Sequence, residues 1–292
     1  MDVFRLTAPA IILSLIAGLL FPGFKILSPT IIPFIGFLIF VSSLSINLGN
    51  LQDSLKKPKP YLTLFLILFL LQPLATYFIA RIFITNPLIL AGLVLAASAP
   101  APAALIYWTR AVKGHIALAI SFTALSHLLS PIVTPLLSYY LLGAYITVPV
   151  MSIAKTLGLT IIIPLALALI LQKVKNIEKI SAPVSIPVYF LLLATVVARS
   201  VPALSNTSNL LVVGIMVFFQ CVFSFTLAWF FSRKWEQRDR EPLIMGTVVR
   251  NNVLLMAIAF AVFGELAALP CVVGFFMQLV FVSIYLYIKK QN

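Results

Sequence analysis

Ten apolar stretches dominate this chain, and most are long enough to cross a lipid bilayer as a helix. The hydrocarbon layer is about 30 Å thick, so a helix needs roughly 20 apolar residues to cross it. We predict spans at 6–22, 30–48, 60–83, 88–112, 115–142, 148–172, 182–202, 209–232, 242–264 and 267–288. The connections between them are too short to hold a soluble domain. The expected fold class is an all-α membrane protein with ten transmembrane helices.

Composition agrees with lipid as the main surrounding of the chain. Hydrophobic residues make up 62% of the sequence and charged residues only 9%, whereas soluble domains carry about 25% charged residues. The net charge of +13 would suit nucleic acid, but the basic residues are scattered through the connections between spans. We therefore expect the lipid bilayer, and no nucleic acid, as a partner.

The basic residues also predict orientation. If the chain crosses ten times, one side of the membrane receives fifteen Lys and Arg residues and the other side three. The fifteen are Arg5, Lys56, Lys57, Lys59, Arg110, Lys113, Lys173, Lys175, Lys179, Arg233, Lys234, Arg238, Arg240, Lys289 and Lys290. Cytoplasmic connections carry an excess of Lys and Arg. We expect a multi-pass protein of the cell (inner) membrane with both termini in the cytoplasm.

Ten spans divide into two halves of five, residues 1–142 and 148–292. An odd number in each half makes the second half enter from the opposite face, which permits the inverted repeat of many secondary transporters. The alternative, ten unrelated helices, stays open because counting alone does not separate the two.

The fourth span of each half is expected to be interrupted. In span four, Pro100 and Pro102 flank Ala101, and each proline removes a backbone donor. In span nine, the stretch 246–252 is polar at a similar depth. Non-helical backbone is tolerated there only beside protein or a water-filled cavity, and two such breaks indicate a transporter's binding site near the bilayer midplane. The alternative for span four is a simple kink.

Arg250 is the strongest single candidate for binding. At about 1.5 Å per residue it lies about 12 Å into span nine, and an arginine at the bilayer centre costs at least about 2.5 kcal/mol. The seven acidic residues all lie at termini, connections or span ends. We expect Arg250 to meet a small anionic solute, with Asn251 and Asn252 beside it. The alternative is a guanidinium satisfied by carbonyl groups of the unwound stretches.

Further polar residues lie inside apolar spans. His127 in span five has Thr123 one turn before it and Ser126 beside it. A buried histidine either relays protons or forms a neutral hydrogen bond in helix packing. Gln72 precedes a proline in span three, where it either lines the site or serves packing.

Enzyme signatures are absent from the sequence. There is no H-E-x-x-H, G-x-S-x-G or P-loop motif. Cys221 and Cys271 lie within apolar runs and are interpreted as small hydrophobic residues. We expect neither catalysis nor a cofactor.

Spans four, five and nine resemble a known family. Residues 99–108, the sequence KGHIAL at 113–118, Thr123 and the sequence SPIVTP at 130–135 resemble the bile acid:sodium symporter family. Residues 250–264 are also similar to arsenite efflux permeases of the same bile-arsenite-riboflavin transporter superfamily. The resemblance implies two inverted five-span repeats that form a panel and a core domain, with spans four and nine crossing at the substrate and ion site.

Several positions depart from the family pattern. Of the sodium ligands that the resemblance implies, only Thr123 and Gln72 remain. The others are replaced by Leu105, Ile106, Ala119, Gly246 and Arg250. We therefore hypothesise that Arg250 supplies a fixed positive charge in place of sodium; the coupling ion stays open between sodium and a proton. A cysteine of the arsenite permeases is matched by Ala101, which disfavours arsenite.

The sequence thus predicts a monomeric secondary transporter of a small organic anion that works by alternating access. The residues expected at its site are Arg250, Asn251, Asn252, Thr123, Ser126, His127, Gln72, Pro100, Ala101 and Pro102. Competing interpretations are an arsenite or oxyanion efflux permease, a sodium-coupled bile-acid-type symporter, and a non-transporting receptor or structural protein.

Overall fold

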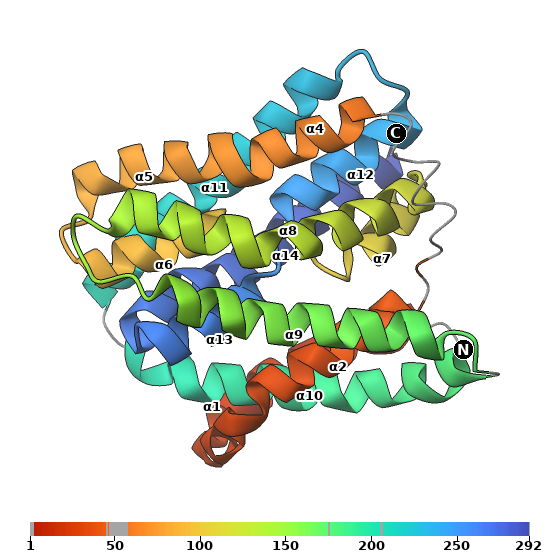
Figure 1. Cartoon of the computed structure of the whole chain (residues 1–292), viewed down its shortest axis with the longest axis horizontal. Helices are drawn as coiled ribbons and strands as arrows, with labels where there is room; N and C mark the ends of the chain where they lie inside the picture. Colours follow the sequence, from red (N-terminus) through yellow and green to blue (C-terminus); the bar gives the residue numbers. More distant parts are fainter. Residues whose placement is uncertain (1–2, 45, 47–57, 175, 205–206, 292) are drawn as a thin grey trace. The chain divides into compact units, whose positions relative to one another are not determined.

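The computed structural model describes residues 3–44, 46, 58–174, 176–204 and 207–291, and its ordered elements are all helical within these ranges (Figure 1). The first elements are α1 (Val3–Leu20), the 3₁₀ helix η1 (Pro22–Thr30), α2 (Ile31–Ser43), α4 (Pro58–Leu66), the π-helix η2 (Ile67–Leu71), α5 (Gln72–Phe83), α6 (Pro87–Ala97) and α7 (Leu105–Ala111). The remaining elements are α8 (Ile116–Leu142), α9 (Val150–Leu171), α10 (Ile177–Leu204), α11 (Thr207–Ser232), α12 (Gln237–Val248), α13 (Asn252–Val262) and α14 (Glu265–Gln291). The all-α prediction is confirmed.

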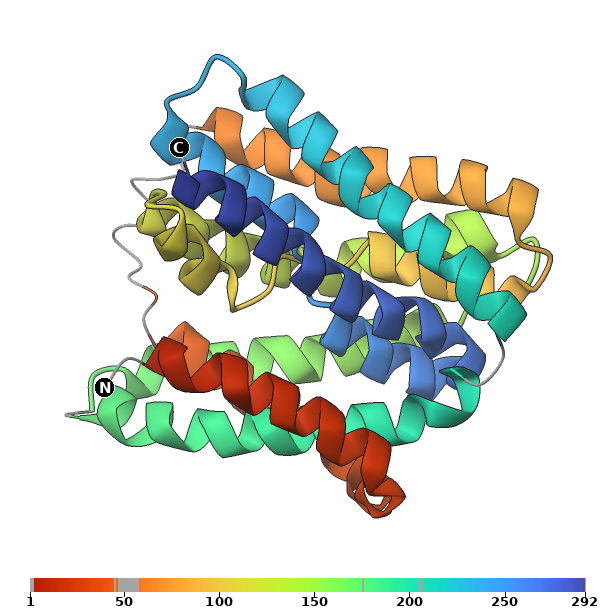
Figure 2. The same ribbon diagram turned by 180° about the vertical axis from the view of Figure 1, so that it is seen from behind.

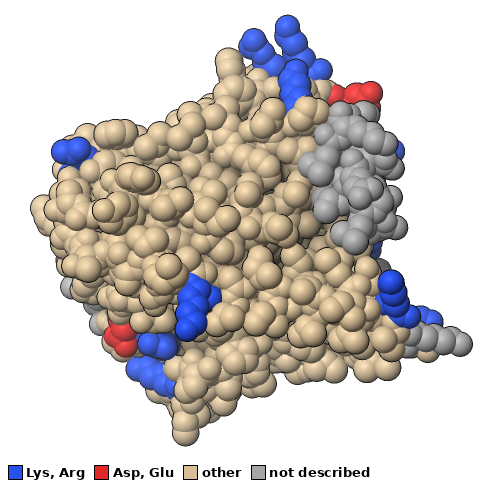
Figure 3. Space-filling model, viewed as in Figure 1, with Lys and Arg blue, Asp and Glu red and all other residues tan. Residues whose placement is uncertain are grey.

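Membrane-spanning character is evident in the described helices. Eight helical stretches among the described residues are long and apolar enough to cross a bilayer. The predicted first span coincides largely with α1, and the predicted fourth span is the short α6 followed by α7. Residues 45, 47 and 48 of the predicted second span lie outside the described residues. On the face drawn in Figure 3, charged side chains form small groups separated by uncharged surface. The count of ten spans stays a prediction.

The chain forms two compact units, and neither coincides with a sequence half. Unit 1 comprises Met1–Ile46 and Leu157–Asn206, and unit 2 comprises Asn47–Thr156 and Thr207–Asn292. In unit 1, α10 packs against α1, η1 and α2. Gly18 permits the close approach of α1 to α10, since a Cβ there would lie 2.6 Å from the carbonyl oxygen of Ala194. Each unit draws on both predicted halves, and the inverted repeat stays a prediction.

Unit 2 holds all the residues predicted for the site. Within it, α8 packs against α6, α7 and α12, while α14 packs against α6, α11 and α13, as seen from behind in Figure 2. A wholly apolar cluster joins α4, α7, α8 and α12 and includes Leu64, Leu105 and Phe122. This packing holds two short pairs of helices, α6 with α7 and α12 with α13, inside the unit.

Both predicted interruptions are present. Span four is non-helical between Ala97 and Leu105, and span nine between Val248 and Asn252. Only part of the polar stretch 246–252 is unwound, because Gly246, Thr247 and Val248 are still helical. The Thr247 hydroxyl donates to the carbonyl of Leu243 in its own helix at 2.9 Å, so its polarity is satisfied without unwinding.

Candidate binding site at the two helix interruptions

The two interruptions contact each other directly. The backbone N–H of Asn251 in the span-nine break donates to the carbonyl oxygen of Pro100 in the span-four break, at 2.9 Å. Each break therefore supplies a partner that the other lacks. Buried backbone groups without partners are costly, so this contact fixes where the two broken spans meet.

Hydroxyl groups on α8 satisfy the backbone of the span-four break. Ser126 Oγ accepts the N–H of Ala101 at 3.1 Å, and Thr123 Oγ1 donates to the carbonyl of Pro102 at 3.2 Å. One end of the break is held by Thr134, whose hydroxyl donates to the Ser98 carbonyl at 3.1 Å. The structure thus places Thr123 and Ser126, two residues expected at the site, beside the span-four break. Their hydroxyls hold the backbone of Ala101 and Pro102.

Asn251 joins α8 to the start of α13. Its Oδ1 accepts the N–H of Leu254 at 3.3 Å, as an N-cap does. Its Nδ2 lies 3.2 Å from Nε2 of His127, which is only 3% exposed. His127 is therefore a direct neighbour of the span-nine break.

Arg250 is buried at the crossing, with 4% of its surface exposed. Its guanidinium donates to the carbonyl of Ala97, the last residue of α6, and to Ser224 Oγ at 3.2 Å. Carbonyl groups at a helix C-terminus carry partial negative charge that a cation stabilises. No ion pair involving Arg250 occurs in the part of the chain that the structure describes. These partners, a carbonyl at the end of α6 and a hydroxyl on α11, match only in part the alternative of a guanidinium satisfied by carbonyl groups of the unwound stretches.

Sequence reasoning missed the residues of α14 that position the span-nine break. Gln278 Oε1 accepts the backbone N–H of Arg250 at 2.9 Å and the side-chain amide of Asn252 at 3.1 Å. Gly274 leaves room for that amide, since a Cβ there would lie 2.9 Å from Asn252 Nδ2. Asn252 Oδ1 has no hydrogen-bond partner. Gln278 could have been predicted as a site residue because it is a single glutamine within an otherwise apolar span.

Gln72 contacts α11, and in the described structure this helix links it to the site. Its amide donates to the carbonyl of Gln220 at 3.0 Å, and Gln220 lies one turn before Ser224. Gln72 Oε1 and the nearby Thr76 hydroxyl are buried without partners. Thr123 and Gln72, the two candidate sodium ligands, thus bond to different backbone groups, and no described hydrogen bond joins them.

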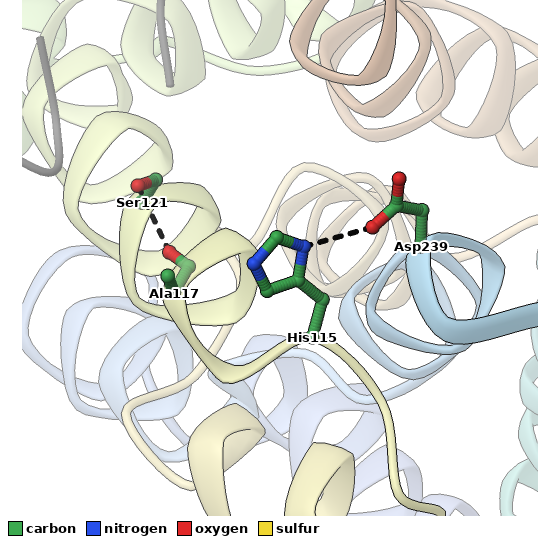
Figure 4. Close-up of polar contacts among 4 residues, drawn as sticks. All are labelled: His115, Ala117, Ser121 and Asp239. Carbon is green, nitrogen blue, oxygen red and sulfur yellow. Dashed lines mark hydrogen bonds and ion pairs between the residues drawn. The ribbon is translucent and has the colours of Figure 1, made fainter. Parts of the chain in front are cut away.

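A second set of polar contacts joins the start of α8 to α12, and α12 to α14, apart from the two helix interruptions. His115 Nδ1 lies 2.8 Å from Asp239 Oδ1 (Figure 4). The backbone N–H of His115 also donates to the carbonyl of Arg238. Both side chains of this pair are exposed. Fully buried Glu241 pairs with Lys289 Nζ at 2.6 Å and accepts from Tyr285 at 2.8 Å.

Several known proteins are similar in sequence to this chain along most of its length. The model of the sodium bile acid symporter family matches residues 32–217. Relatives include the uncharacterised protein YbaS of Bacillus subtilis (27% identical over 98% of this chain and 96% of that protein). They also include a probable sodium/metabolite cotransporter, BASS1, of Arabidopsis thaliana (28%, over 79% of this chain and 59% of that protein).

A third relative is the arsenical-resistance protein Acr3 of Alkaliphilus metalliredigens, 26% identical over 84% of this chain and 76% of that protein. Both resemblances predicted from spans four, five and nine are thereby confirmed. The matching family is one of membrane transporters rather than enzymes, which agrees with the absence of enzyme motifs. The chain belongs to the sodium bile acid symporter family of membrane transporters.

Proposed function

We propose that this protein is a secondary transporter that moves a small organic anion by alternating access around the helix crossing, without using sodium. One observation carries the proposal: a buried guanidinium, that of Arg250, lies at the carbonyl end of α6 with no carboxylate as its partner in the described structure.

The absence of sodium coupling is argued from what surrounds this charge. The end of α6 is a place where a cation is stabilised, and Arg250 places a covalently attached cation there. Leu105 and Ala119, which stand at two positions of the implied sodium ligands, are fully buried apolar side chains. Apolar side chains offer no oxygen to a sodium ion. Arg250 therefore takes the role of the cation.

The preference for an anion follows from the same charge. A buried cation without an ionised partner is costly in a low-dielectric interior, and an anionic solute that docks beside it offsets this cost. The guanidinium has more N–H donors than its contacts with Ala97 and Ser224 use. A carboxylate is the solute group that such donors bind best.

Sodium replacement in vesicles tests the proposal. A thermal-stability screen of small carboxylates on the detergent-solubilised protein, with and without sodium, selects the solute for uptake in proteoliposomes. We expect equal uptake when sodium is replaced by choline, and loss of uptake in Arg250→Gln. Arg250→Lys, which keeps the charge but loses the forked donors, is expected to retain part of the uptake. Uptake that vanishes in choline would refute sodium independence.

The competing functions predict other outcomes of the same experiment. A sodium-coupled bile-acid-type symporter requires sodium for uptake, and an arsenite or oxyanion permease is stabilised by arsenite or an inorganic oxyanion rather than by carboxylates. A receptor or structural protein binds its solute without flux. The Ala101 position, where the resemblance implies a cysteine, favours the organic anion over arsenite.

We further propose that the protein acts as a monomer in the cell (inner) membrane, with both termini cytoplasmic. The division of Lys and Arg residues, fifteen against three, between the two sets of connections supports this orientation. Reaction of single cysteines placed at either end with a membrane-impermeant maleimide, applied to intact and to opened cells, tests the orientation.

A further inference from the structure

We propose that His127 is a proton-binding site that controls the span-nine break and thereby couples proton movement to solute movement. This inference rests on the proposed function for its role in transport, although the proton site itself is argued from geometry alone. The site is defined by the contact between the His127 ring and the side chain of Asn251.

The amide of Asn251 has a fixed orientation. Its oxygen accepts the Leu254 N–H at the start of α13, so the nitrogen is the atom that faces the imidazole. An amide nitrogen only donates hydrogen bonds. Nε2 of His127 must therefore be the unprotonated, accepting nitrogen, and the ring proton of the neutral side chain lies on Nδ1.

Binding of a proton at Nε2 destroys this contact. Two donors then face each other at 3.2 Å. Relief requires either that the two side chains separate or that the amide turns over, and a turned amide no longer caps α13 through Leu254. Loss of its N-cap destabilises the first turn of a helix. Protonation of one ring nitrogen is thus transmitted to the start of α13 at Asn252, two residues after Arg250.

Charged and titratable groups around α8 lie mostly at its ends. The residues 98–104 and the helices α6, η2 and α13 carry none. The packed elements contribute Lys59 and Tyr61 from α4, Tyr77 and Arg81 from α5, Tyr107 and Arg110 from α7, Arg238, Asp239, Arg240 and Glu241 from α12, and Arg250 from the span-nine break. Asp239 pairs with His115, which is about 18 Å from His127 along α8. Tyr77 bonds to Tyr145 beyond the other end of α8. Arg250 directly precedes Asn251 in the sequence and is therefore the charged residue next to the contact between Asn251 and His127.

This arrangement links the proton to an anion. A protonated His127 adds a second positive charge near Arg250, and like charges in a low-dielectric interior repel strongly. An anion bound between them offsets this repulsion, so the anion promotes protonation. By linkage, the proton promotes anion binding by the same factor. One proton and a monovalent anion then cross together without net charge, while Arg250 stays on the protein.

Histidine NMR tests the site with the proton as the only ligand. The chain has two histidines, so ring-¹⁵N-labelled protein of the variant His115→Gln reports on His127 alone. We expect Nε2 without a proton at neutral pH and with a proton on acidification. Hydrogen exchange of the segment 252–262, corrected for the chemical exchange rate, should accelerate over the same pH range. A neutral ring with its proton on Nε2 would overturn the proposal.

Two variants separate a switch from a merely structural histidine. We expect His127→Gln to lose the pH dependence of exchange in 252–262 and the control His115→Gln to keep it. If His127→Gln keeps the dependence, the proton site is refuted. A negative screen for anion uptake in vesicles, with the His127 response intact, counts against the transport proposal alone. Sodium-independent uptake with that response missing counts against the proton site alone.

Discussion

Replacement of Gly274 by alanine places a methyl group where the side chain of Asn252 now lies. The added Cβ would be 2.9 Å from Asn252 Nδ2 and 3.2 Å from its Cγ. The amide can withdraw, but it then leaves Oε1 of Gln278, which also holds the backbone of Arg250. A buried polar group left without its partner costs about 1–3 kcal/mol. Alanine in place of glycine stabilises a helix by about 1 kcal/mol, so we expect a net loss of up to about 2 kcal/mol.

A matched control isolates the steric contribution. Gly214 also lies in a helix of unit 2, and a Cβ there would meet nothing within 4 Å. We expect Gly214→Ala to gain up to about 1 kcal/mol from helix propensity alone. The measurement is reversible unfolding of both variants in mixed micelles, together with the affinity for the anion that the thermal-stability screen identifies. Equal stability of the two variants would show that the space beside Asn252 is not limiting and would refute this reasoning.

Three more outcomes are expected. Ser126→Ala leaves the buried N–H of Ala101 without its acceptor and should cost about 1–3 kcal/mol of unfolding free energy. The control is Ser283→Ala, which removes an exposed hydroxyl that bonds only within its own helix. Equal losses of unfolding free energy in the two variants would contradict the role of Ser126 as the acceptor for Ala101. Asp239→Asn weakens an exposed pair with His115 and should change stability by less than about 1 kcal/mol; a larger loss in the same unfolding assay would contradict this. Gln278→Leu removes the acceptor shared by Arg250 and Asn252. It should reduce anion affinity by more than about tenfold, a difference of about 1.4 kcal/mol, with unchanged affinity in a binding titration as the contrary result.

Prolines illustrate how far sequence reasoning reaches in this fold. Pro131 and Pro135 lie inside α8 without ending it, whereas Pro100 and Pro102 lie in a complete break. The residue type is the same, so proline alone does not decide between a kink and an interruption. The span-four break persists because hydroxyls on α8 and the N–H of Asn251 satisfy its backbone. These partners lie about 20 to 150 residues away in the sequence, beyond any local pattern.

From the order of residues alone, the helical class, most helix boundaries and the few polar residues inside apolar runs can be predicted. This is possible because lipid forces every spanning backbone into helices and makes each buried polar side chain conspicuous. The hydrogen-bond partners of these polar residues are known only from the packing of the helices. Arg250 donates to Ala97 and Ser224, and Gln278 accepts from the span-nine break. Hydrogen bonds act over about 3 Å, so the pairing of distant residues depends on how helices pack, which the order of residues along one helix does not specify.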